Sequence, residues 1–255
     1  MSELDRTLVA APQEAGSKVE IYSGVARLAR TVWGSEVKLA GTRPTTAVVW
    51  CHPTANFLGH YALAGLAERG FGAIGLTTRY VGNDTSLILE NCLLDIGSMV
   101  AHLRGSGYER VVLVGNSGGA GAVPYYQAQA VTPSVTSPPG GGPDLTRAGL
   151  QPADAIVLFN GHQSRARMCS EWLDPAIVEE QAPFRRDPSL DMYDQGNGPP
   201  YSPEFVQRYR AAQLARNRRI SAWAEEQLEV ITTPGHFPEG LSDLAFVVHG
   251  TVADL

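Results

Sequence analysis

The feature that most constrains the fold of this chain is an apolar run that breaks into a glycine-rich turn. Residues 111–114 read Val-Val-Leu-Val, residues 115–119 read Gly-Asn-Ser-Gly-Gly, and the stretch that follows is compatible with a helix. A short apolar run bounded by glycine predicts a buried strand. A serine in a sharp turn needs glycine neighbours, because only glycine lets adjacent backbone pass so closely. The sequence therefore predicts that Ser117 stands at the tip of a strand–turn–helix unit.

Short apolar runs alternate with amphipathic helix patterns along much of the chain. The runs are apolar throughout, which is typical of parallel strands covered by helices on both faces. Glycines such as Gly70 and Gly105 stop the helix patterns. This order predicts an α/β fold with a mostly parallel sheet and helices on both faces. The predicted strands are residues 46–51, 73–77, 111–114 and 155–159, with a strand or hairpin in 19–39, and the predicted helices are residues 58–69, 87–104 and one from about 119.

The second half of the chain departs from this alternation. Residues 131–154 are rich in proline and glycine, which is typical of a functional or disordered loop. Ser202 has the character of a helix N-cap, with proline and then an acidic residue after it. The arginines of that long helix, at positions 208, 210, 216, 218 and 219, are expected on its solvated face. We predict a leader over 1–18, a core over 19–162, a mainly helical cap over 163–240 and a late strand within 241–255.

Composition narrows the function classes. The formal net charge is −6 and no dense basic run occurs, which argues against nucleic-acid binding. No apolar stretch approaches the length of a membrane span, and the N-terminus lacks the basic and apolar regions of a secretory signal. Cys51, Cys92 and Cys169 fit no zinc pattern and are expected to be reduced thiols. We therefore expect a cytoplasmic protein without a membrane span.

Residues 115–119 form a Gly-x-Ser-x-Gly motif that resembles the nucleophile elbow of the α/β-hydrolase superfamily, and the resemblance extends from about residue 20 to 162. It implies a serine hydrolase of the esterase or lipase kind. Ser117 would attack an ester-type carbonyl, a histidine would take its proton, and an acid would orient that histidine. The implied substrate is a small-molecule ester or acyl compound. The resemblance implies no metal and no organic cofactor.

The resemblance also implies an oxyanion hole made of two backbone N–H groups. One belongs to Gly118, directly after the nucleophile. The other lies in a loop after an earlier strand, where this chain has His52 and Pro53 in place of the His-Gly of many relatives. Proline has no N–H, so the second donor is expected at Thr54 or Ala55. His52 itself is expected to play only a supporting part.

The partners of the nucleophile have several candidates in the sequence. The superfamily places the acid after the nucleophile and the histidine last. Asp254, after the apolar run 244–249, stands where the acid is expected, but no histidine follows it. His236 resembles a Gly-His histidine loop, but no acid-bearing strand is apparent between 160 and 235. In a third alternative, both partners lie beyond residue 255.

We favour a hydrolase that is truncated at its C-terminus or is one part of a split enzyme, so that the fold continues beyond the chain end. Such a chain would expose an unpaired apolar sheet edge and would pair with a complementing C-terminal segment or with itself. The alternatives are an unusual triad that uses His236 or His249, and a hydrolase fold with a purely binding role. His162 is a further histidine to test. A dinucleotide-binding module is disfavoured, because the strand end does not carry Gly-x-Gly-x-x-Gly.

Overall fold

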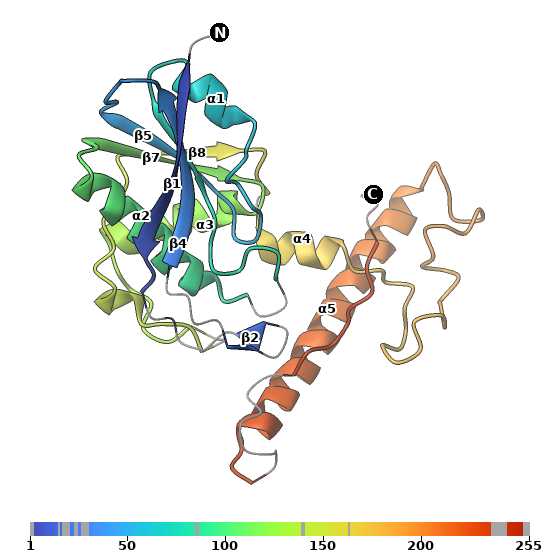
Figure 1. Cartoon of the computed structure of the whole chain (residues 1–255). Helices are drawn as coiled ribbons and strands as arrows, with labels where there is room; N and C mark the ends of the chain where they lie inside the picture. The colour runs from blue at the N-terminus through green and yellow to red at the C-terminus, as the bar shows by residue number, and fades with distance from the viewer. Residues whose placement is uncertain are drawn as a thin grey trace. The chain divides into compact units, whose positions relative to one another are not determined.

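In a computed structural model, the chain divides into two units, Met1–Gln163 and Ser164–Leu255. The first unit holds a sheet with helices on both sides, and the second is arranged along one long helix (Figure 1). None of the helices in the described ranges combines the length and the apolar character needed to cross a bilayer. The structure describes residues 3–14, 16, 21–22, 25–26, 31–84, 87–138, 141–162, 164–235 and 244–251.

Strands of the first unit form a six-stranded mixed sheet, which confirms the predicted α/β fold. In chain order they are β1 (Leu4–Pro12), β4 (Thr31–Leu39), β5 (Thr46–Cys51), β6 (Gly72–Leu76), β7 (Arg110–Asn116) and β8 (Ala155–Phe159), while the short β2 (Ile21–Tyr22) and β3 (Val25–Ala26) pair with each other. Across the sheet the order is β1-β4-β6-β5-β7-β8. The pairs from β6 through β5 and β7 to β8 are parallel, whereas β1 with β4 and β4 with β6 are antiparallel.

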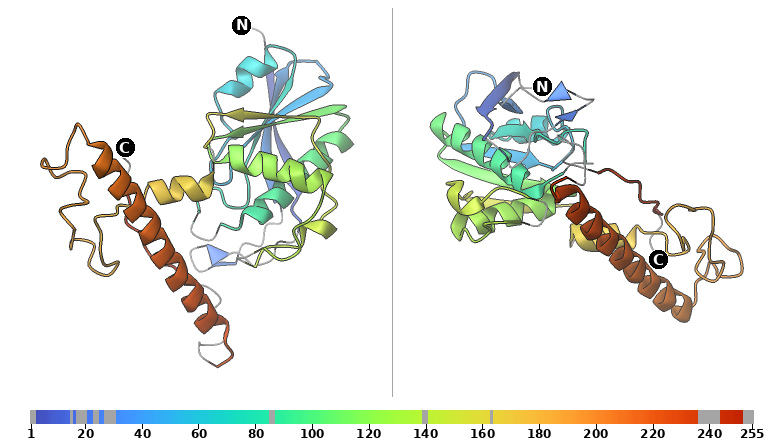
Figure 2. Two further views of the ribbon diagram at one scale, coloured as in Figure 1. Left: turned by 180° about the vertical axis from the view of Figure 1, so that it is seen from behind. Right: turned by 90° about the horizontal axis from the view of Figure 1, so that it is seen from below.

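Helices cover both faces of this sheet (Figure 2). α1 (Ala62–Ala67) packs on one face, and α2 (Leu89–Gly105) and α3 (Gly119–Val131) pack on the other. In β5, Val49 faces α2 and α3 whereas Val48 faces α1. Successive side chains of a strand point to opposite faces, so a strand covered on both sides is apolar at every position.

The helix predicted over residues 58–69 is shorter in the structure, because turns occupy its first residues. The N–H of His60 donates to the C=O of Phe57 (3.1 Å). The side chain of Asn56 accepts from the N–H of Leu58 (3.0 Å). Short polar side chains that bond nearby backbone compete with helix formation. The apolar residues of this segment therefore pack against the sheet from turns as well as from α1.

The prediction of a loose leader over residues 1–18 is wrong, since β1 lies within it. β1 pairs with β4 along its whole length, from Leu4 opposite Leu39 to Pro12 opposite Thr31. Ala11 is the fully buried residue of the strand. An edge strand with so little buried apolar surface carries a weak sequence pattern, and its backbone pairing with a distant strand fixes its structure.

β8 is the outermost strand on its side of the described sheet, because it pairs with β7 alone there. All five of its residues are exposed, and its large side chains from Ile156 to Phe159 are between 38% and 56% exposed. This is an apolar edge of the kind that pairs readily with additional chain.

The second unit is organised by α5 (Pro203–Thr232), on which α4 (Arg165–Glu171) packs (Figure 1). The side chain of Ser202 accepts from the N–H of Phe205 (3.1 Å), as an N-cap does. The helix start predicted at Ser202 is confirmed. Serine, proline and an acidic residue at consecutive positions are a local signal for a helix start, because they act on the first turn of the helix itself.

The predicted strand over residues 244–249 is wrong. This segment is extended, belongs to the second unit and forms no strand among the described residues. It leads to Gly250, which makes an isolated bridge with Leu173. Phe246 is 45% exposed and contacts Trp223 edge to face, with ring centroids 4.7 Å apart. An apolar run of this length becomes a strand only where a second strand offers its edge.

The prediction that the arginines of α5 are solvated is wrong for Arg216, whose side chain is fully buried. The buried residues of α5 are Phe205, Tyr209, Gln213 and Arg216. Their spacing of three or four residues defines one face of a helix. Arg216 therefore stands at a position on the buried face of α5, where its charge needs partners.

Those partners come from the two segments that flank α5 in the chain. Nε and Nη2 of Arg216 donate to the carboxylate of Glu180 (2.9 and 2.6 Å). Nη1 donates to the backbone C=O groups of Asp174 and His249 (both 2.7 Å). One guanidinium thus connects both flanking segments to α5, and the planar group suits this because it offers several donors at once.

We predict that Arg216→Ala lowers the free energy of unfolding of the second unit by about 3 kcal/mol, because a carboxylate and two carbonyls lose their donor. The hydrogen bond from Arg216 lowers the pKa of Glu180. The contribution should therefore be complete near neutral pH and be lost as pH falls through the Glu180 pKa. Hydrogen–deuterium exchange of α5 at neutral and acidic pH measures this. The exposed Arg218→Ala is the control, and equal protection in both variants would contradict the prediction.

Candidate functional site

Ser117 occupies a strained turn between β7 and α3. Its backbone φ is +51°, in the left-handed region that side chains rarely adopt. Its N–H donates to the C=O of Phe159 in β8 (3.1 Å), and its C=O accepts from the N–H of Ala120 in α3 (3.0 Å). The turn is thus held from both sides, and it is the sharp strand–turn–helix position that the glycine-rich motif predicts.

Two of the motif's glycines are required by close backbone approach. A Cβ atom on Gly119 would lie 2.0 Å from the carbonyl oxygen of Cys51, at the end of β5. A Cβ atom on Gly115 would lie 2.3 Å from the carbonyl oxygen of Gly119. By contrast, a Cβ atom on Gly121 would meet no atom within 4 Å. Gly115 and Gly119 therefore let the end of β5, the turn and α3 pack together.

The structure brings His162 to Ser117. Nε2 of His162 lies 3.4 Å from the Ser117 hydroxyl oxygen, a long hydrogen bond of the kind that catalytic pairs show in the absence of substrate. His162 follows β8 through Asn160, whose φ is +48°, and Gly161. A Cβ atom on Gly161 would lie 2.2 Å from Cβ of Ala120, so this segment runs close against α3.

The sequence pattern assigned His162 no defined role. The sequence feature that could have identified it as a site residue is its position directly after a predicted strand of the same parallel sheet. The carboxyl ends of parallel strands meet at one edge, and ligands bind beyond that edge. The other proposed partners, His236 and Asp254, lie outside the described residues. His249 lies in the second unit, where its backbone C=O accepts from Arg216.

The two N–H groups that were alternatives for the second oxyanion donor both donate to a side chain. The N–H groups of Thr54 and Ala55 both donate to Nδ1 of His52, at 3.0 and 2.9 Å. Gly118 is the N-cap residue of α3, and amides at a helix start have no partner within the helix. The loop after β5 is thus organised around the imidazole of His52, to which the sequence assigned only a supporting part.

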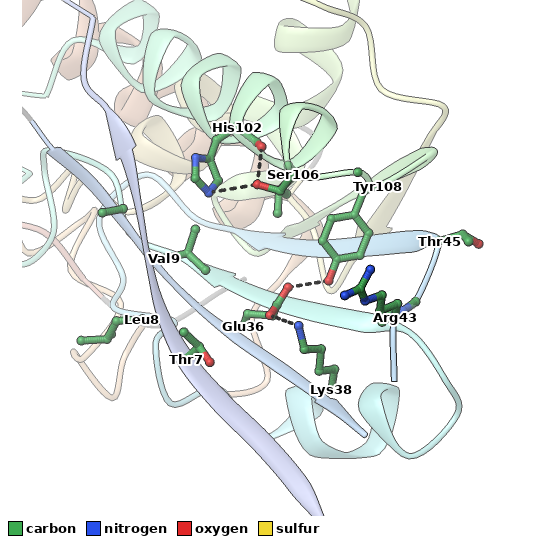
Figure 3. A pocket seen from close by; sticks show the side chains of 14 residues that line it. Thr7, Leu8, Val9, Glu36, Lys38, Arg43, Thr45, His102, Ser106 and Tyr108 are labelled. Atoms are coloured by element: carbon green, nitrogen blue, oxygen red, sulfur yellow. Dashed lines mark hydrogen bonds and ion pairs between the residues drawn. The ribbon is translucent and has the colours of Figure 1, made fainter. Parts of the chain in front are cut away.

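A pocket of the first unit lies at the other end of the parallel strands from Ser117, where β5 and β7 begin (Figure 3). There Tyr108 donates to the Glu36 carboxylate (2.5 Å), and Nζ of Lys38 lies 2.8 Å from it. Burial raises the pKa of Tyr108, and Glu36 adds to that rise, so the phenol stays protonated. This pocket is separate from the Ser117 site. Within the described ranges, His, Cys, Asp and Glu form no group of three that could hold a metal ion.

No protein-family model and no curated protein matches the chain. Solved structures do match it. Brefeldin A esterase, a bacterial homologue of human hormone-sensitive lipase, is 13% identical with a TM-score of 0.41, over 85% of this chain and 52% of that one. A bacterial heroin esterase is 14% identical with a TM-score of 0.34, over 69% and 47%. A hypothetical protein of Pseudomonas aeruginosa is 15% identical with a TM-score of 0.40, over 66% and 46%.

The chain spans about half the length of each of these three structures. At identities of 13–15% and TM-scores of 0.34–0.41, these likenesses carry no conclusion about what the site does. The site is therefore judged from its own geometry, because one fold carries many chemistries.

We predict that Gly119→Ala destabilises the first unit by about 1–3 kcal/mol, the cost typical of overpacking, because its methyl group would overlap the carbonyl of Cys51. The same displacement should lower the reactivity of Ser117. The matched control is Gly121→Ala in the same helix, which should stabilise by about 0.5–1 kcal/mol. Urea unfolding measures both variants, and equal stabilities would contradict the close approach of Gly119 to β5.

Proposed function

We propose that the protein is a serine hydrolase that cleaves a carboxylic ester-type bond through an acyl-enzyme on Ser117. The observation that carries the proposal is the 3.4 Å distance between the Ser117 hydroxyl and Nε2 of His162. A serine hydroxyl is a weak nucleophile until a base takes its proton. The strained backbone at Ser117 adds support, because such strain is concentrated at functional sites.

In the proposed reaction, Nε2 of neutral His162 accepts the Ser117 proton while the serine oxygen bonds to the carbonyl carbon. The carbonyl oxygen becomes an oxyanion, which the N–H of Gly118 stabilises. His162 then gives its proton to the departing alcohol oxygen as the ester C–O bond breaks. Water attacks the acyl-serine with His162 as base again, which releases the carboxylic acid and restores the serine.

The remaining roles complete the proposal. Asp254 is the proposed acid, and His236 is the alternative base. The proposed cap covers residues 163–240, and the division of the chain between Gln163 and Ser164 supports a start at this point. The substrate class is a small-molecule ester or acyl compound, and loops and caps rather than the sheet set its identity.

We predict that a fluorophosphonate probe labels the full chain and that Ser117→Ala abolishes the labelling. His162→Ala should slow labelling by about 10²–10⁴-fold, the usual contribution of a general base. His102→Ala is the matched control, because that histidine lines the pocket at the other end of the parallel strands, where β5 and β7 begin. Its labelling rate should equal that of the wild type.

Other results would revise the proposal in distinct ways. Labelling that persists in Ser117→Ala would remove Ser117 as the nucleophile. Labelling that requires Ser117 but survives His162→Ala would place the base elsewhere, and His236→Ala and His249→Ala would then identify it. A folded chain that the probe does not label at all would favour a binding role for the fold.

A further inference from the structure

We propose that the side chain of His52 is an oxyanion donor, in the place that backbone N–H groups of the loop after β5 were expected to take. This inference rests on the proposed function of Ser117. It assigns to a side chain a task that the sequence assigned to Thr54 or Ala55. Three observations carry it: the bonds at Nδ1 of His52, the position of Nε2, and the proline that follows.

The hydrogen bonds at Nδ1 assign the tautomer of the ring. Nδ1 accepts from the N–H groups of both Thr54 and Ala55, at 3.0 and 2.9 Å. A ring nitrogen that accepts such bonds carries no proton, so neutral His52 has its proton on Nε2. A proton could enter at Nδ1 only with the loss of both bonds. The ring is therefore held as a neutral donor.

The donor nitrogen faces the serine turn. A Cβ atom on Gly118 would lie 3.1 Å from Nε2 of His52 and 3.6 Å from its Cε1. Nε2 is thus the ring atom nearest to the position that a side chain on Gly118 would take. Glycine at position 118 leaves room for the imidazole to lie there. The two proposed donors therefore lie close to each other at the turn that carries Ser117.

The residues that follow His52 in the loop after β5 are poorly suited to be the second oxyanion donor. Pro53 has no N–H to offer, and the next two N–H groups are already bonded to His52. Their bonds to Nδ1 polarise the ring and strengthen the Nε2 donor, since hydrogen bonds in a chain reinforce one another. The backbone dipoles of Thr54 and Ala55 thus act on the oxyanion through the ring rather than directly.

The two imidazoles at the serine turn, His162 near Ser117 and His52 near Gly118, then have complementary protonation. His162 directs Nε2 to the serine hydroxyl, and as the proposed base it must be unprotonated at that atom. His52 holds its proton on Nε2 and cannot act as that base in the same tautomer. Different environments that separate two titratable groups in this way assign acid, base and donor roles.

Two substitutions separate a donor role from a structural one. In His52→Asn, the amide oxygen can replace Nδ1 as the acceptor of the loop bonds, but nothing replaces Nε2. In His52→Gln, the longer amide can place a donor at Nε2, but the Nδ1 acceptor is lost. With p-nitrophenyl acetate as the substrate, we expect kcat to fall about 10²–10³-fold in His52→Asn, as for loss of an oxyanion donor, with KM within about twofold. We expect His52→Gln to recover at least tenfold of that loss.

The opposite order would overturn the inference. If His52 served only to hold its loop, His52→Asn would be the more active variant and His52→Gln the weaker one. Wild-type turnover that requires Ser117 and is unchanged in His52→Asn would overturn the donor role while the proposed function stands. Absence of Ser117-dependent turnover in the wild type would overturn both.

A measurement on the wild-type chain guards against variants that fail to fold. Long-range proton–nitrogen correlation spectra distinguish the two neutral tautomers of a histidine. We expect His52 in the tautomer with the proton on Nε2, and a proton on Nδ1 would overturn the inference whatever the variants do.

Discussion

The parallel pairing of β7 between β5 and β8 is the constraint on which the candidate site depends. Because the three strands run in the same direction, the residues that follow them meet at one edge of the sheet. His52 follows β5, Ser117 follows β7 and His162 follows β8. Ser117 and His162 are 45 residues apart in the chain, yet their side chains lie within hydrogen-bonding distance. The bond from the Ser117 N–H to the Phe159 carbonyl extends the β7–β8 pairing into the turn itself.

Each unit also contains a buried arginine, which holds in place a segment that has little apolar surface of its own. In the first unit, the backbone N–H and Nη2 of Arg79 both donate to Asp95 of α2 at 2.7 Å, which fixes the segment after β6. Burial raises the pKa of Asp95, and Arg79 opposes that rise. In the second unit, Arg216 has the corresponding part on α5. Pairs of this kind are costly to break, because the remaining partner stays buried without its counter-charge.

Several elements were predictable because their signals are local. The strand over 155–159 has the predicted bounds, and the start of α5 was evident from Ser202 and the residues after it. The turn at Ser117 was equally clear from its glycines, although the structure gives only Gly115 a steric cause within a few residues, and Gly119 a cause at the distant carbonyl of Cys51. The predictions that were wrong concern segments whose secondary structure depends on pairing with a strand far away in the sequence. β1 became a strand because β4 offered its edge, and 244–249 did not become one because no strand of the described chain pairs with it.

The sequence by itself determined the class of fold and the sharp turn at Ser117, because strand and helix periodicity and the preference of a tight turn for glycine are properties of neighbouring residues. Only the tertiary structure decided which groups surround that serine. His162 reached it through the pairing of β8 with β7, and the bonds at Nδ1 turned His52 from a supporting residue into a candidate donor. Arg216 was likewise assigned to the buried side of α5 by partners from distant segments. Contacts between segments far apart in the chain depend on strand order and register, and local sequence patterns do not encode these.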